Sequence, residues 1–172
     1  LAIMKGVISG APGMSLSDLP SSFNLLIGNN GGCLGEVSAL ALLLGLAYML
    51  WKKIITWHIP VSILATVFVF SGIMYWVNPE IYVSPVVQLL SGGLMLGAVF
   101  MATDYVTSPI TPKGQILYGI LLGILTGLFR IFGANAEGVS FAIILSNLLV
   151  PMIERITIPK AFGQVKEAKQ HE

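Results

Sequence analysis

Five long stretches without a charged side chain constrain this sequence more than any other feature. They cover residues 37–51, 54–79, 81–103, 114–129 and 138–153. A helix needs about 20 mainly apolar residues to cross a bilayer. The second and third stretches reach this length, and the others reach it if Lys52, Arg130 and Arg155 extend their side chains toward the headgroups. The sequence therefore predicts an all-α integral membrane protein with five transmembrane helices, near 36–53, 58–77, 84–103, 114–132 and 138–156.

Composition agrees with a membrane protein and argues against several classes of site. Only 10% of the residues are charged and 55% are hydrophobic, whereas a soluble domain is about 25% charged. A net charge of +1 gives no basis for a nucleic-acid partner. The one cysteine and two histidines are too few for a disulfide or a metal cage, so no metal site is expected. No nucleophile lies beside a base and an orienting group, so no catalytic residue is assigned.

The first 35 residues differ from the rest in being rich in Gly, Ser, Asn and Pro. Within them, Leu19 to Ile27 fits a short interfacial or re-entrant helix capped by Asp18 or Ser17, expected near 17–27. We therefore divide the chain into an extracytoplasmic loop or re-entrant segment (1–35), a five-helix transmembrane domain (36–158) and a cytoplasmic tail (159–172). Because numbering starts at Leu1 without a signal peptide, we also expect a longer polypeptide upstream.

Orientation follows from the distribution of the nine lysines and arginines. All except Lys5 and Arg130 fall on one side of the five expected spans, in the loop at 52–53, near residue 113 and in the C-terminal part. The positive-inside rule assigns that side to the cytoplasm. We expect a multi-pass protein of the cell membrane, with a cytoplasmic C-terminus and residue 1 on the extracytoplasmic side.

A glycine-rich turn before the first expected span is the first candidate site. Such a turn, when it opens a helix, exposes backbone N–H groups that hold a phosphate or another anion. The alternative is a tight turn in which the carboxylate favours the helix start through the macrodipole. The candidate binding residues are Asn29, Asn30, Gly31, Gly32 and Glu36.

The loop after the third expected span is the second candidate. It offers the carboxylate of Asp104 and the hydroxyls of Thr107 and Ser108, followed by prolines that hold the backbone extended. These oxygens could ligate Na⁺ or hydrogen-bond a polar ligand, and a plain turn is the third possibility. Elsewhere, Gly119, Gly123 and Gly127 form a stripe of small residues that favours close helix packing.

Three motifs resemble one known family. They are the run from Gly28 to Gly45, the run from Met101 to Gly114, and Gly138 to Ala142. Together they resemble the D-type subunit of the Rnf ion-translocating electron-transport complex, which is related to the B-type subunit of the Na⁺-translocating NADH:quinone reductase. The overall look of the motifs favours the Rnf version, and the resemblance covers essentially the whole chain.

The resemblance implies that this chain is the C-terminal half of a two-repeat bundle that carries FMN. The family's FMN is joined through its phosphate to a threonine that would lie just upstream of Leu1. Ser9-Gly10-Ala11-Pro12 imitates the attachment motif, but proline has no hydroxyl, so the attachment is not transferred to it. Riboflavin is a possible second, non-covalent flavin. Other membrane and peripheral subunits would supply the ferredoxin and nicotinamide chemistry.

We therefore expect a subunit of an ion-translocating oxidoreductase, with no complete active site of its own. Flavins among the helices would pass electrons while Na⁺ or H⁺ moves. The alternative is a channel or secondary solute transporter built from a five-helix repeat. A third hypothesis, a membrane scaffold without a ligand, predicts that Glu36 and Asp104 tolerate substitution.

Overall fold

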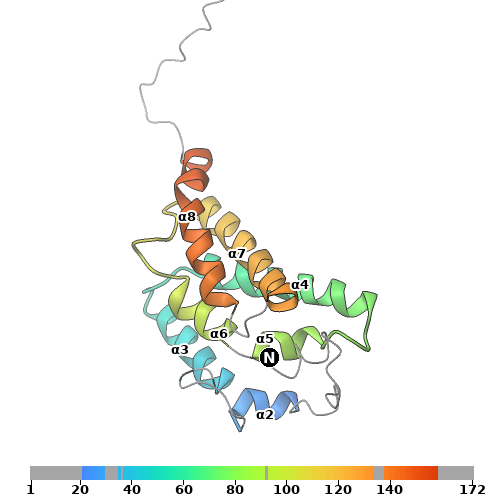
Figure 1. Cartoon of the computed structure of the whole chain (residues 1–172). Helices are drawn as coiled ribbons and strands as arrows, with labels where there is room; N and C mark the ends of the chain where they lie inside the picture. Colours follow the sequence, from blue (N-terminus) through green and yellow to red (C-terminus); the bar gives the residue numbers. More distant parts are fainter. Residues whose placement is uncertain (1–20, 30–34, 36, 92, 134–137, 159–172) are drawn as a thin grey trace, which may run out of the picture.

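The computed structural model of the chain describes residues 21–29, 35, 37–91, 93–133 and 138–158. All regular structure within these residues is helical (Figure 1). The helices are α2 (Ser22–Ile27), α3 (Ala39–Trp51), α4 (His58–Val77), α5 (Pro85–Leu90), α6 (Leu94–Leu96), the π-helical turn η2 (Gly97–Met101), α7 (Pro112–Phe132) and α8 (Val139–Thr157).

Three of these helices, α4, α7 and α8, are long and apolar enough to cross a membrane. They match the second, fourth and fifth expected spans to within two residues at each end. The chain is thus an all-helical membrane protein over the residues described. A short helix is present within the expected range 17–27 as α2, but it starts at Ser22 and its cap is Ser21, whose hydroxyl accepts from the Asn24 N–H at 3.4 Å, rather than the expected Asp18 or Ser17. Residues 17–20 lie outside the described part. The tail 159–172 lies outside it as well.

The first expected span is shorter than we predicted. α3 has 13 residues, from Ala39 to Trp51, which at 1.5 Å per residue rises about 20 Å, against a hydrocarbon core of about 30 Å. Ser38 fixes its start, because its hydroxyl accepts a hydrogen bond from the Ala41 N–H at 3.3 Å. At the other end, Lys53 takes a left-handed φ of 55°, which stops the helix.

The third expected span is interrupted, so our prediction of one continuous helix near 84–103 is wrong. α5 ends at Leu90, Ser91 is extended (φ −93°, ψ 136°), and the chain becomes helical again at Leu94. The second part continues as the π-helical turn η2. Hydropathy does not register such a break, because the residues on both sides of it are equally apolar.

The glycine stripe of α7 packs directly on α4. A Cβ added at Gly123 would lie 2.6 Å from Thr66 Cβ, and one added at Gly127 would lie 2.5 Å from a ring carbon of Phe70. Real Cβ atoms do not approach so closely, so glycine is required for this helix pair. Contacts advance in the same direction along both helices, from the Thr56–Gln115 hydrogen bond (2.8 Å) onward. α4 and α7 are therefore parallel, and their first turns lie at the same end of the bundle.

The core lies where α4, α7 and α8 meet the interrupted helix. α8 returns antiparallel to α7, and Gly97 of η2 lets Val139 of α8 approach closely. The buried cluster contains Ile59, Ile63, Val67, Leu94, Ala98, Ala102, Tyr118, Leu122, Val139, Ile143, Val150 and Ile153. The second helical piece of the third stretch, α6 with η2, therefore belongs to the interior of the bundle.

Candidate functional site

The most distinctive polar arrangement in the bundle is at the interrupted helix. Arg130, near the end of α7, is only 3% exposed. Its Nη1 donates to the Gln88 carbonyl oxygen at 2.5 Å, and its Nη2 donates to the Ser91 carbonyl oxygen at 2.8 Å. The end of a helix leaves carbonyl oxygens without an intrahelical donor and carries partial negative charge. The guanidinium thus caps α5 by hydrogen bonding and by charge.

Sequence reasoning missed this arrangement. It expected Arg130 to extend its side chain toward the headgroups at the end of the fourth span. The signal available was Ser91-Gly92-Gly93 in the middle of an apolar stretch. Small, flexible residues inside a predicted transmembrane helix mark a discontinuous helix, and a buried arginine is a suitable cap for it.

A second polar element lines the buried face between α7 and α8. The hydroxyl of Tyr118 donates to Asn147 Oδ1 at 2.6 Å. Thr126 and Ser146 are fully buried, and neither hydroxyl has a hydrogen-bond partner among the described residues. An unsatisfied buried hydroxyl costs about 1–3 kcal/mol. Together with Arg130, these side chains give an otherwise apolar bundle a polar interior face.

The glycine-rich turn is described only in part. Asn30, Gly31, Gly32 and Glu36 lie outside the described residues, whereas Asn29 is exposed directly after α2. The Asn29 N–H donates to the Asn24 carbonyl oxygen at 3.0 Å.

Gly28, which precedes Asn29, has φ 96°, and a Cβ there would lie 3.0 Å from Ser38. Both facts demand glycine at this position. The turn brings the end of α2 against the start of α3, the element on which the anion-binding hypothesis rests.

The second candidate loop is an ordered turn. Asp104 Oδ1 accepts from the Val106 N–H at 3.4 Å, and Oδ2 accepts from the Thr107 hydroxyl at 3.3 Å. The Ser108 N–H donates to the Asp104 carbonyl oxygen at 3.2 Å. Glu154 of α8 accepts from the Ile110 N–H at 3.4 Å, which fixes the loop against that helix. The structure therefore brings Asp104, Thr107 and Ser108 together in one turn.

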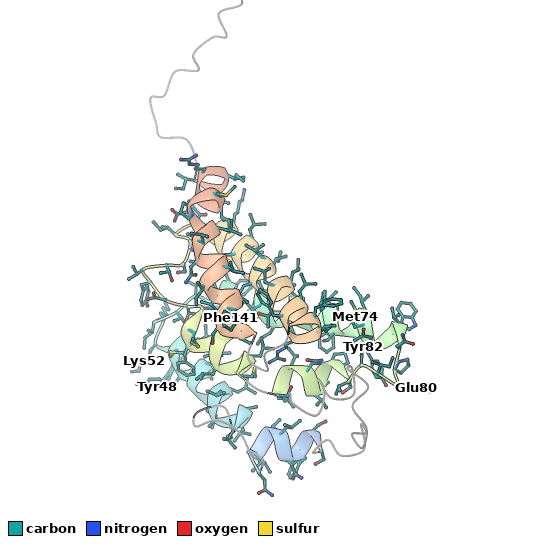
Figure 2. The ribbon with its side chains drawn as sticks, in the orientation of Figure 1. Tyr48, Lys52, Met74, Glu80, Tyr82 and Phe141 are labelled. Atoms are coloured by element: carbon teal, nitrogen blue, oxygen red, sulfur yellow. The ribbon has the colours of Figure 1, made fainter. Side chains whose placement is uncertain are left out.

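The two candidate sites lie apart in the structure (Figure 1). Figure 1 shows α2 at the bottom of the view and the loop before α7 at its left. Figure 2 places Lys52 at the left, where α3 ends, and Glu80 at the right, beyond the end of α4. No group of three or more His, Cys, Asp or Glu side chains is gathered within the described residues.

Comparison with known proteins identifies the family. A model of the NQR2, RnfD, RnfE family matches residues 1–163. The D-type subunit of the Na⁺-translocating ferredoxin:NAD⁺ oxidoreductase complex of Acetobacterium woodii is 42% identical over 172 residues, which cover 99% of this chain and 50% of that protein. The D-type subunit of the proton-translocating ferredoxin:NAD⁺ oxidoreductase complex of Clostridium ljungdahlii is 42% identical over 143 residues, covering 81% of this chain and 42% of that protein.

The D-type subunit of an ion-translocating oxidoreductase complex from Sodalis glossinidius is 43% identical over 121 residues, covering 70% of this chain and 35% of that protein. The chain spans about half the length of the Acetobacterium woodii relative. The family model covers nearly the whole chain, and the resemblance drawn from three motifs is confirmed. The chain therefore belongs to the NQR2, RnfD, RnfE family.

Proposed function

We propose that this chain is part of the D-type subunit of an Rnf complex, a membrane-bound oxidoreductase that couples electron transfer from ferredoxin to NAD⁺ with translocation of Na⁺ or H⁺. One observation carries the proposal: 42% identity over 172 residues to the corresponding protein of Acetobacterium woodii. Its partners are the other membrane and peripheral subunits of the complex, because the chain has no cluster of cysteines and no dinucleotide-binding motif.

The proposed topology keeps five membrane crossings. α4, α7 and α8 cross as single helices. α3 crosses with help from its flanking residues, and the interrupted segment from Pro85 to Met101 crosses as two helical pieces. A break in a helix of a membrane-embedded bundle is tolerated where protein satisfies the freed backbone groups, and Arg130 does so at Gln88 and Ser91. With five crossings, residue 1 would lie outside and the C-terminus in the cytoplasm.

The proposed cofactors are a covalent FMN, on a threonine upstream of Leu1, and riboflavin as a second, non-covalent flavin. Near the turn after α2, the described residues offer an FMN the exposed Asn29, whereas the space beside Gly28 is already occupied by Ser38. A flavin, when bound, accepts and releases electrons singly or in pairs. Asn29, Asn30, Gly31, Gly32 and Glu36 would hold its phosphate and polar edge.

A second flavin site is proposed at the loop from Asp104 to Thr111. Hydroxyl and carboxylate oxygens are suitable partners for a ribityl chain, and Asp104, Thr107 and Ser108 are already assembled there. Tyr105, which is 73% exposed beside them, supplies an aromatic surface. An oxygen-ligand site for Na⁺ would use the same atoms.

A channel or secondary transporter is the second candidate, and one observation favours it. Discontinuous helices characterise the binding sites of many transporters, and this bundle contains a discontinuous helix between Pro85 and Met101. The two candidates differ in their dependence on redox substrates. A transporter moves its solute in the absence of ferredoxin and NAD⁺. The proposed redox complex moves ions only when both redox substrates are present.

The experiment is to purify the complex with the full-length form of this subunit and record visible flavin absorbance on the separated polypeptide. Ion uptake into vesicles is then measured with and without reduced ferredoxin and NAD⁺. Flavin on the polypeptide and uptake that requires both redox substrates support the proposal. A colourless polypeptide, or uptake that is indifferent to the redox substrates, refutes it in favour of the transporter.

A further inference from the structure

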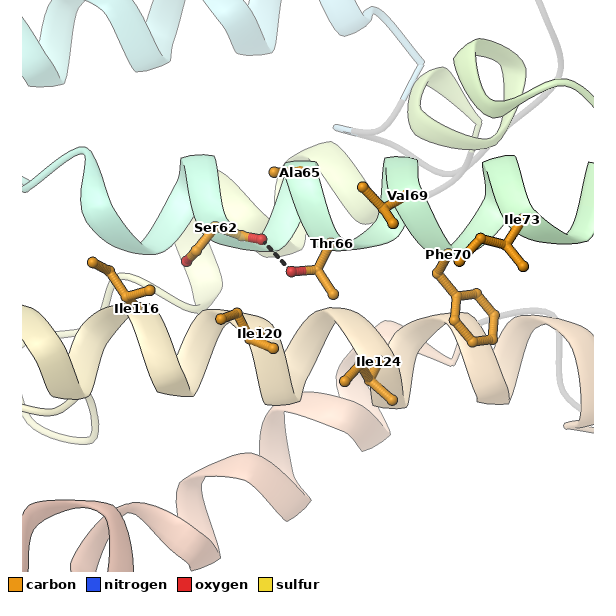
Figure 3. Close-up of a pocket in the computed structure, with 9 residues that line it drawn as sticks. All are labelled: Ser62, Ala65, Thr66, Val69, Phe70, Ile73, Ile116, Ile120 and Ile124. Carbon is orange, nitrogen blue, oxygen red and sulfur yellow. Dashed lines mark hydrogen bonds between the residues drawn. The ribbon is translucent and has the colours of Figure 1, made fainter. Parts of the chain in front are cut away.

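An apolar groove of about 540 Å³ runs along the outside of the α4–α7 pair. Figure 3 shows the side chains that line it, from α4 above and α7 below. Its volume falls within the range of small-molecule sites, about 300–1,000 Å³. The lining residues are Ser62, Ala65, Thr66, Val69, Phe70, Ile73, Ile116, Ile120 and Ile124.

The groove exists because the helices approach so closely at the glycine stripe. Gly119 and Gly123 of α7 pack against α4, so the two helix backbones come close together. The larger side chains of α4 and α7 beside this contact form the two sides of the groove. The two hydroxyls in the groove need no partner from outside. Ser62 donates to the Ile59 carbonyl oxygen at 2.9 Å, and Thr66 donates to the Ser62 carbonyl oxygen at 2.7 Å. An apolar occupant therefore leaves no hydrogen bond unmade.

One end of the groove is polar and cationic. Lys113 precedes Ile120 by seven residues and Ile124 by eleven, so all three lie on one line along α7. The lysine is exposed. The Thr56–Gln115 hydrogen bond joins the two helices at the same end. Because α4 and α7 are parallel, both helices also present the positive ends of their dipoles there.

The length of the groove corresponds to one leaflet of a bilayer. From Ile116 to Ile124, α7 rises about 12 Å, and from Ser62 to Ile73, α4 rises about 16 Å. Half of a hydrocarbon core is about 15 Å. The groove thus starts where Lys113 would meet the headgroups and ends near the bilayer midplane.

From this geometry, we propose that the groove binds an anionic phospholipid, with one acyl chain between α4 and α7 and the headgroup phosphate at Lys113. Amphipathic complementarity carries the proposal: an apolar slot of one leaflet's depth opens at a cationic, hydrogen-bonding end. It is independent of the flavin assignment and holds for either orientation of the protein in the membrane.

The test uses the whole complex in nanodiscs that contain phosphatidylglycerol with a photoreactive diazirine in one acyl chain. After illumination, labelled peptides are mapped by mass spectrometry. We expect label on the peptides that contain Ile120 and Thr66. Replacing the probe with a phosphatidylcholine of the same acyl chain should lower that label about fivefold, and Lys113→Gln should abolish the difference between the two lipids. Arg155→Gln, at the exposed end of α8, is the matched cation control and should change nothing.

Ile120→Trp fills the groove and should remove most of the label, whereas Ile144→Trp, on an exposed face of α8, should leave it unchanged. Ala65→Leu, which fills the groove with a good helix former, replaces Ile120→Trp if that variant does not assemble. Equal labelling by the two lipids overturns the headgroup assignment. Label spread evenly over α8 overturns the proposal. So does an unlabelled groove, and cysteines inserted in the groove would then crosslink to another protein helix.

Discussion

Arg130 and Ser91 are 39 positions apart in the sequence, and the structure joins them by a hydrogen bond of 2.8 Å from the guanidinium to the backbone carbonyl. With the bond to Gln88, this contact closes the end of α5 inside the bundle. The side chain and the backbone break thus require each other: an uncapped helix end is costly when it is buried inside a helix bundle, and so is a buried guanidinium without acceptors.

Removing this cap should be strongly destabilising. Arg130→Met deletes the hydrogen bonds to Gln88 and Ser91 and leaves their two buried carbonyl oxygens without that donor, which should cost about 3 kcal/mol or more. Arg130→Lys keeps the charge but has no planar guanidinium that can donate to two carbonyl oxygens at once. Its loss of stability should therefore be smaller than that of Arg130→Met. Unfolding of the complex in a detergent titration, followed by tryptophan fluorescence, measures both.

The control for this cap is Arg155→Met, at the exposed end of α8, which should cost much less. Added guanidinium ion should partly restore Arg130→Met and have no such effect on Arg155→Met. If Arg130→Met is as stable as Arg155→Met, the capping assignment is wrong.

The α4–α7 contact predicts an asymmetric response to alanine at two glycines. Gly123→Ala places a Cβ 2.6 Å from Thr66 Cβ and 3.2 Å from the Ile63 carbonyl oxygen, so the helices must separate. The expected cost is about 1–3 kcal/mol. At Gly72, the nearest atom is Pro85 Cγ at 3.8 Å, an ordinary contact.

Gly72→Ala should therefore be neutral or slightly stabilising, since alanine favours a helix over glycine. Thermal melting of the two variants decides the matter. Equal melting temperatures would show that the glycine stripe is not needed for packing.

The Tyr118–Asn147 hydrogen bond should reveal itself in a double-mutant cycle. Tyr118→Phe leaves the Asn147 amide without its donor at 2.6 Å, at an expected cost of about 1–3 kcal/mol. Replacing both partners, as Tyr118→Phe with Asn147→Leu, removes the unsatisfied group and should recover part of that loss. Denaturant titrations of the two single variants and the double variant give the coupling, and strict additivity would contradict it.

Lys53 offers a stabilising substitution. Its φ of 55° is left-handed, a conformation that costs a residue with a Cβ about 1 kcal/mol and glycine almost nothing. Lys53→Gly should therefore raise the melting temperature slightly. Lys52→Gly is the matched control, because Lys52 has an ordinary φ of −75° and should lose stability. A lower melting temperature for Lys53→Gly than for Lys52→Gly would refute the strain argument.

Asp104 separates the three interpretations of its loop. Asp104→Asn removes the charge while Oδ1 still accepts from the Val106 N–H. A flavin contact should largely survive this change, whereas a Na⁺ site should weaken and require more Na⁺ for activity. Flavin content and the Na⁺ dependence of ferredoxin:NAD⁺ activity are the measurements. Unchanged flavin, electron transfer and ion dependence in Asp104→Ala would identify the loop as a plain turn.

What the sequence alone determined is the membrane class, the family, and the positions of α4, α7 and α8. Hydropathy is a local property: the transfer free energy of each run depends only on its own residues, so three helices could be placed to within two residues at each end. The exact start of α7 was not predicted: we expected it near residue 114, whereas the helix begins at Pro112 and is capped by Thr111, whose hydroxyl accepts from the Gly114 N–H at 3.1 Å.

Only the tertiary structure decided the break in the third stretch, the cap that Arg130 provides and the groove beside the glycine stripe. Each depends on groups far apart in the sequence. The break at Ser91 is tolerable because a donor arrives from α7, and the groove exists because α4 and α7 meet backbone to backbone at Gly123. The transfer free energy of single residues predicts neither the break nor the groove, because both arise only when separate helices have packed.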